Sequence, residues 1–117
     1  MILMTPNPVR WTKALKSMYG YPPYDPEAVL GFMALRDAYA DTVRRVCREE
    51  NVSLLDIDLR YLEWERETGR SCAELIPDGM HPNTEGHRLV ADALRPILER
   101  ILVSLTGADD SIAPSVP

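Results

Sequence analysis

Two short apolar runs with a helical segment between them constrain the fold of this chain most strongly. The first run covers residues 1–5 and the second covers residues 52–59, with Leu54, Leu55 and Ile57 as its core. Continuous apolar runs of this length are typical of strands buried on both faces, as in parallel sheets. A helix between two such strands predicts a β-α-β unit with a right-handed crossover. A buried strand at the very first residues also leads us to expect further sequence upstream.

The segment between the runs has helical periodicity from about residue 30 to residue 50. Its predicted apolar face consists of Leu35, Tyr39, Thr42, Val43, Val46 and Cys47. Charged side chains, among them Arg36, Asp37 and Arg44, fall on the other faces. Asn51 follows as a residue that commonly ends a helix.

The rest of the chain predicts a short helix, a long helix and irregular segments. Residues 60–68 predict the short helix, which Gly69 ends, and Asn83 or Thr84 begins a helix that runs to about Leu105. The apolar stripe of the long helix is Val90, Leu94, Ile97, Leu98, Ile101, Leu102 and Leu105. Pro96 should kink this helix or break it in two, because proline removes a donor and clashes with the preceding turn.

Residues 9–27 look irregular, with Asp25 and Pro26 as the start of the next helix. The tyrosine-rich part, residues 19–27, either lines a substrate cleft or packs back on the core. Residues 106–117 are polar and without periodicity, which predicts a flexible tail.

Composition excludes several classes of protein. The chain has 117 residues, enough for a single domain, and a formal net charge of −5. Arg44, Arg45 and Arg48 form a local basic cluster, but acidic residues follow at once, so we expect a solvated helix face and no nucleic-acid partner. No apolar run is long enough to span a membrane. No signal peptide is recognisable, which favours a cytoplasmic location.

The two cysteines, Cys47 and Cys72, match no metal or redox motif. Cys47 lies in the helical pattern and is interpreted as a small core residue. Whether the two cysteines pair stays open at this point.

The stretch from Asp78 to His87 carries the chemistry. Asp78 stands three residues before His81 in a turn that also contains Gly79, and Pro82 biases His81 away from helical geometry. A carboxylate bound to one ring nitrogen fixes the tautomer of a histidine and stabilises its imidazolium form. The same spacing also suits a turn cap beside a packed histidine, so the local pattern alone leaves the catalytic and structural interpretations even.

A metal site would combine Asp78, His81 and His87. Zinc needs three or four converging ligands with supporting hydrogen bonds, and no further ligand stands out. We therefore expect no metal here and interpret His87 as a structural residue near the turn.

The block Asp78-Gly79-Met80-His81-Pro82-Asn83, followed by Gly86-His87, resembles the last conserved block of the SGNH hydrolases, the GDSL esterase/lipase family. Residues 1–8 resemble that family's penultimate strand and loop, residues 52–58 its last strand, and residues 89–105 its C-terminal helix. Only the terminal block is specific. The resemblance makes residues 1–105 the C-terminal portion of such a domain and residues 106–117 a tail.

The resemblance implies a three-layer α/β/α, flavodoxin-like fold with five parallel strands, of which this chain supplies about two strands and two main helices. It implies carboxylic-ester hydrolysis by a Ser-His-Asp triad, with His81 as general base and Asp78 orienting it, and no metal or organic cofactor. Family members act on lipid esters, thioesters and acetylated carbohydrates.

The chain departs from the family in its nucleophile. The family's serine lies in a Gly-Asp-Ser block, and none of this chain's serines has that context: Ser17, Ser53, Ser71, Ser104, Ser111 and Ser115. The oxyanion-hole Gly and Asn are absent as well, since Asn7 stands in Thr-Pro-Asn-Pro. We expect either an esterase completed by a missing N-terminal half, or a non-catalytic half-fold that serves as a binding or assembly module, with a homo-oligomer partner that covers its open sheet edge.

Overall fold

The computed structural model describes residues 1–19 and 33–107 of the chain. In order, its elements are β1 (Ile2–Met4), α1 (Lys13–Tyr19), α2 (Met33–Glu49), β2 (Ser53–Leu55), α3 (Ile57–Thr68), the 3₁₀ helix η1 (Cys72–Leu75) and α4 (Thr84–Thr106). The predicted Asp25–Pro26 helix start and the predicted tail beyond residue 107 lie outside the described residues, as does most of the tyrosine-rich loop.

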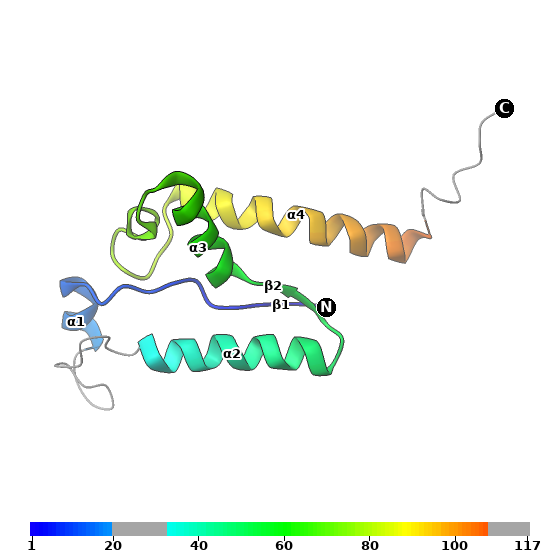
Figure 1. The fold of residues 1–117 in the computed structure, drawn as a ribbon, viewed down its shortest axis with the longest axis horizontal. Coiled ribbons are helices and arrows are strands. Elements are labelled where there is room, and N and C mark those ends of the chain that lie inside the picture. The colour runs from blue at the N-terminus through cyan, green and yellow to red at the C-terminus, as the bar shows by residue number, and fades with distance from the viewer. Residues whose placement is uncertain (20–32, 108–117) are drawn as a thin grey trace.

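β1 and β2 form a parallel pair, so the predicted β-α-β unit is confirmed as an α/β arrangement. Ile2 pairs with Ser53 and Met4 with Leu55. The ladder ends where the amide of Thr5 donates to the carbonyl of Leu55 at 3.1 Å. α2 lies on one side of the pair and α4 on the other (Figure 1).

The core lies between the strands and the α3–α4 side. α3 and α4 pack on each other, and α4 also packs on β2. The buried cluster consists of Leu55, Ile57, Tyr61, Trp64, Cys72, Leu75, Ile76, Leu89 and Ile97. Both cysteines are buried and free, so they do not pair, and Cys47 is a core residue as predicted.

The second strand is shorter than predicted. It ends at Leu55, and Ile57 is the first residue of α3. The reason is Asp56, whose side chain accepts the amide of Leu59 at 3.1 Å and so caps a helix where the apolar pattern alone would continue a strand. Gly69 ends α3 as predicted, with φ of +70°.

Two further predictions need correction. Residues 13–19 form α1 instead of irregular chain, because the Thr12 hydroxyl accepts the amide of Leu15 at 3.2 Å and the Leu15 side chain is buried. Pro96 does not break the last helix, since α4 is continuous through it. The cap prediction for this helix is confirmed: the Asn83 side chain accepts the amide of Gly86 at 2.9 Å.

The predicted apolar faces of α2 and α4 are only partly buried. In α2 the buried side chains are Arg36, Ala40 and Cys47, while Leu35 and Tyr39 are exposed. In α4, Ile97 is buried, but Leu98, Leu102 and Leu105 are exposed. The burial of Arg36 contradicts its assignment to the polar side of the helix.

Arg36 is buried because it binds the segment that follows β1 and the first turn of α3. Its guanidinium donates to the carbonyls of Pro6 and Asn7, at 2.9 and 3.2 Å, and to the carboxylate of Asp58. A buried cation needs such partners to offset its lost hydration.

Replacing Arg36 should therefore be costly. Arg36→Met leaves two carbonyls without their donor and removes one of the two arginines that bind Asp58, so we expect a loss of roughly 3–5 kcal/mol in the free energy of unfolding. Urea unfolding measures it. Arg45→Met is the control, because Arg45 is exposed and meets Glu49 at only 3.7 Å; it should cost less than about 0.5 kcal/mol. Equal losses in the two variants would contradict this account of Arg36.

Candidate active site

Asp78 and His81 meet in the loop ahead of α4. The Nδ1 atom of His81 lies 2.6 Å from Oδ2 of Asp78. The other carboxylate oxygen accepts the amides of Met80 and His81, at 2.8 and 2.7 Å. The Asp78 carboxylate thus closes its own turn and holds the imidazole at the same time.

These contacts favour the ionised form of Asp78. The amide of His81, the imidazole of His81 and the amide of Met80, in that order, lower the pKa of Asp78 to about 2. The carboxylate is therefore charged at neutral pH. The imidazole beside it is open to solvent, with 71% of its side chain exposed.

Gly79 makes this turn feasible. Its φ is +89°, a conformation that other residues adopt only with strain. A Cβ atom there would lie 2.3 Å from the carbonyl oxygen of Arg10 and 2.7 Å from Cγ2 of Thr12. The turn therefore needs glycine both for its backbone angle and for its close approach to residues 10–12.

Residues 7–12, the segment that follows β1, hold the turn from outside. They donate hydrogen bonds to three consecutive carbonyl oxygens of the turn: Thr12 Oγ1 to Asp78 at 2.8 Å, the Arg10 amide to Gly79 at 2.8 Å and Asn7 Nδ2 to Met80 at 2.9 Å. Sequence reasoning missed this contact. Asn7 between two prolines was the available signal, since a polar side chain in a rigid loop is suited to binding another loop.

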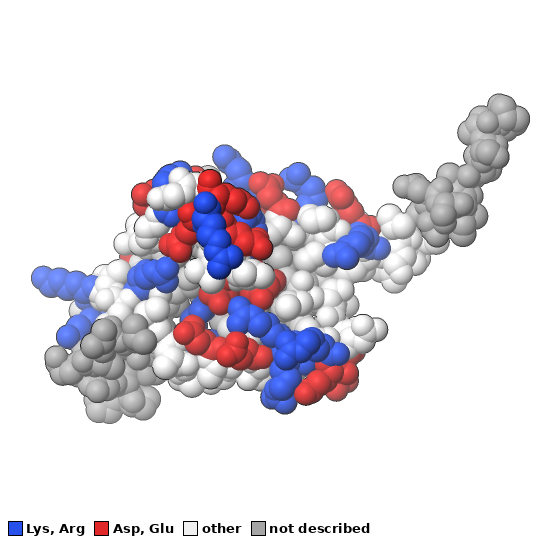
Figure 2. Space-filling view, in the orientation of Figure 1, with Lys and Arg blue, Asp and Glu red and all other residues white. Residues whose placement is uncertain are grey.

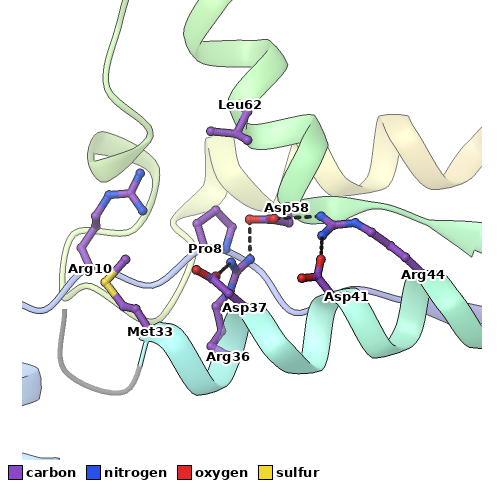
Figure 3. A pocket seen from close by; sticks show the side chains of 9 residues that line it. All are labelled: Pro8, Arg10, Met33, Arg36, Asp37, Asp41, Arg44, Asp58 and Leu62. Carbon is purple, nitrogen blue, oxygen red and sulfur yellow. Dashed lines mark hydrogen bonds and ion pairs between the residues drawn. The ribbon is translucent and has the colours of Figure 1, made fainter.

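A hollow of about 400 Å³ opens at the same end of the strands. Its lining, drawn in Figure 3, is Pro8, Arg10, Met33, Arg36, Asp37, Asp41, Arg44, Asp58 and Leu62. Arg36 and Arg44 point from α2 toward Asp58 of α3. Open α/β sheets bind ligands beyond the carboxyl ends of their strands, which is where this hollow and the Asp78–His81 turn both lie.

Charges around the hollow are paired. Arg44 binds Asp56 at 2.8 Å and Asp58 at 2.9 Å, and these bonds raise the pKa of Arg44 above its usual value. Burial by itself would raise the pKa of Asp56, but the contacts with Arg44, the amide of Leu59 and the Thr5 hydroxyl together outweigh it, and the pKa is lowered. Figure 2 shows the same intermixing of acidic and basic side chains across this face of the molecule.

The other predicted or conceivable site residues lie apart from the pair. His87 is exposed in the first turn of α4, and among residues 1–19 and 33–107 no hydrogen bond or ion pair joins it to Asp78 or His81. Within the same ranges no three His, Cys, Asp or Glu side chains are grouped to hold a metal ion. The Cys72 thiol is fully buried, and burial followed by its bond with Glu65 raises its pKa to about 11, which leaves it a poor nucleophile.

The structure is thus an α/β arrangement with an Asp–His pair in the turn ahead of α4. The family model for GDSL-like lipases and acylhydrolases matches residues 6–94, most of the chain. The chain belongs to the GDSL-like lipase/acylhydrolase family. Neither the curated proteins nor the solved structures gave a match. In the described part of the chain no helix has the length and apolarity to cross a membrane.

Gly79→Ala should destabilise the turn in two ways, through the positive φ at this position and through the clash of the added Cβ with Arg10 and Thr12. We expect a loss of roughly 2–5 kcal/mol in the free energy of unfolding, the sum of left-handed strain and steric clash. Gly69→Ala is the matched control, because Gly69 also has a positive φ, of +70°, but nothing lies within 4 Å of its added Cβ. It should cost only the strain, roughly 1–2 kcal/mol. Equal costs in urea unfolding would show that the clash with Arg10 and Thr12 is unimportant.

The lowered pKa of Asp78 should appear in the pH dependence of stability. An Asp whose pKa is about 2 when folded and 3.8 when unfolded adds stability above pH 3.8, and this is lost as pH falls toward 2. Asp78→Asn should therefore lose less stability than wild type between pH 4 and pH 2. His81→Ala should keep an intermediate dependence, because the two amide donors remain. Urea unfolding at a series of pH values measures this, and identical slopes in all three proteins would contradict it.

Proposed function

We propose that this chain supplies the acid–base half of a Ser-His-Asp site that hydrolyses carboxylic esters, with His81 as general base and then general acid and Asp78 as its orienting carboxylate. The observation that carries the proposal is the 2.6 Å contact between His81 Nδ1 and Asp78 Oδ2. Membership of the GDSL-like lipase/acylhydrolase family supports it.

The geometry suits proton transfer at neutral pH. With Nδ1–H donated to Asp78, the Nε2 atom of His81 is the basic nitrogen. It would take the proton of the attacking serine hydroxyl and return it to the leaving alkoxide; water then releases the acid by the same route. Asp78, ionised because its pKa is about 2, stabilises the imidazolium between these steps.

The nucleophile in this proposal comes from residues outside this sequence. The four serines that the structure describes stand in α1, in β2, as the cap of η1 and in α4: Ser17, Ser53, Ser71 and Ser104. Among the described residues no hydrogen bond joins a serine to His81. We assign the serine and the oxyanion-hole donors to an N-terminal half that lies outside these 117 residues.

The exposed apolar side chains support a missing half. The described residues contain a sheet of only two strands, and Met4 of β1 is 51% exposed. Leu35 and Tyr39 on α2, and Leu98 and Leu102 on α4, are exposed although they lie on the predicted apolar faces. In the proposed complete domain, a three-layer flavodoxin-like sheet, further strands would cover such side chains.

A second function is favoured by the same surface. Unpaired strand edges and exposed apolar side chains also suit a non-catalytic binding or assembly module, in which a second copy of the chain covers the edge. The two proposals differ in whether His81 matters for chemistry.

Ester hydrolysis by the isolated chain tests the missing nucleophile. Purified wild-type chain should hydrolyse p-nitrophenyl acetate no faster than His81→Ala, because no serine is available to the imidazole. Robust turnover that disappears in His81→Ala would overturn the assignment of the nucleophile to residues outside this sequence.

A fluorophosphonate probe, which reacts with activated serines, tests the acid–base role. When the tagged protein is purified from the cells that encode it, the probe should label a serine in its own upstream sequence or in a polypeptide that co-purifies with it. His81→Ala should reduce this labelling at least ~100-fold, because the serine loses its base. His87→Ala is the matched control and should leave it unchanged. Equal labelling with His81→Ala, or no labelled polypeptide at all, would sink the catalytic proposal and leave the assembly module.

A further inference from the structure

Asn7 holds the peptide unit between Met80 and His81. Its side-chain amide donates to the carbonyl of Met80 at 2.9 Å, across 73 positions of sequence. The amide of His81, which belongs to the same peptide unit, donates to Asp78 Oδ1 at 2.7 Å.

Peptide planarity couples these two bonds. In a trans peptide the carbonyl and the N–H point in opposite directions within one rigid plane. Fixing the carbonyl of Met80 from the Asn7 side therefore fixes the direction of the His81 N–H on the Asp78 side. Hydrogen bonds in series also polarise one another, so the bond to Met80 strengthens the one to Asp78.

From this arrangement we propose that Asn7 is a positioning residue for the Asp78–His81 pair, acting through the Met80–His81 peptide to orient the carboxylate that holds the imidazole. The catalytic meaning of this role rests on the proposed function. The structural coupling itself does not.

Asn7 is well placed for such a role because it is itself held on several sides. The buried guanidinium of Arg36 donates to the Asn7 carbonyl at 3.2 Å and to the Pro6 carbonyl at 2.9 Å. The Asn7 side chain also donates to the carbonyl of Pro8 at 3.0 Å. Proline on both sides limits the backbone further, since each ring fixes its own φ and Pro8 restricts Asn7. α2 is thereby linked to the turn through Arg36 and Asn7.

Thr12 provides a matched comparison. Its hydroxyl donates to the carbonyl of Asp78 at 2.8 Å, so it binds the same turn with a bond of similar length. The peptide it holds ends in the amide of Gly79, however, and that amide donates to the carbonyl of Ile76 at 2.8 Å. Loss of the Thr12 bond should loosen the turn without removing a donor from the carboxylate.

The test is NMR of the histidine rings and of the Asp78 carboxyl in the isolated chain. The chain has two histidines, so His87→Gln assigns the His81 signals. In wild type the ring nitrogen shifts should show His81 protonated at Nδ1, held by Asp78. In Asn7→Leu the fraction of this tautomer should fall, and the pKa of Asp78 should rise from about 2 toward 3.8. Thr12→Val should leave both unchanged even where it lowers the melting temperature.

Two results would overturn the proposal: a folded Asn7→Leu protein with wild-type His81 and Asp78 signals, or shifts of equal size in Thr12→Val. Asn7→Ala, which removes the amide with less steric demand, is judged by the same signals should Asn7→Leu fail to fold. The measurement involves neither a serine nor an ester, so failure of the fluorophosphonate test would refute the proposed function and leave the coupling through Asn7 standing.

Discussion

The buried guanidinium of Arg36 is the interaction on which the rest of this structure depends. After β1 the chain leaves the sheet through Pro6 and Pro8, which have no N–H to donate, and β2 has already turned into α3 at Ile57. The carbonyls of Pro6 and Asn7 therefore need donors from outside the sheet, and Arg36 supplies both. Asp58 balances its charge. One side chain thus ties α2, the end of β1 and the start of α3 together.

The same arginine explains how a largely exposed site can be ordered. Asn7 links Arg36 to the Asp78–His81 turn, because it accepts from Arg36 with its carbonyl and donates to Met80 with its side chain. On its outer side the turn is held by its own hydrogen bonds. The Asp78 carboxylate accepts them from two amides and contacts the imidazole. The imidazole can then stay exposed to solvent and still keep a fixed orientation.

Features set by neighbouring residues could be predicted from the sequence, and those set by distant partners could not. The parallel pair, the Asn83 cap, the end of α3 at Gly69 and the family were predicted, because each depends on a local pattern or a contiguous motif. Arg36 was placed on the polar side because periodicity counts a guanidinium as polar whatever its partners are. Asn7 was considered only as an oxyanion-hole residue, and its contact with the turn was missed because its partner, Met80, lies far along the chain. The catalytic roles of Asp78 and His81 stay predictions.

Some side chains on the predicted apolar faces of α2 and α4 are exposed for a similar reason. The apolar face of a helix reflects the contacts that the helix makes in the complete protein, including contacts with parts that lie outside this chain. Arg44 on one flank of α2 reaches the end of β2 through Asp56, whereas Leu35 and Tyr39, spaced four residues apart, form an apolar row without burial. An apolar row left in water has an unfavourable free energy that burial against further strands would remove. Under the proposed function, one missing half that carries both further strands and the serine would account for the incomplete burial and for the lack of a serine near His81 together.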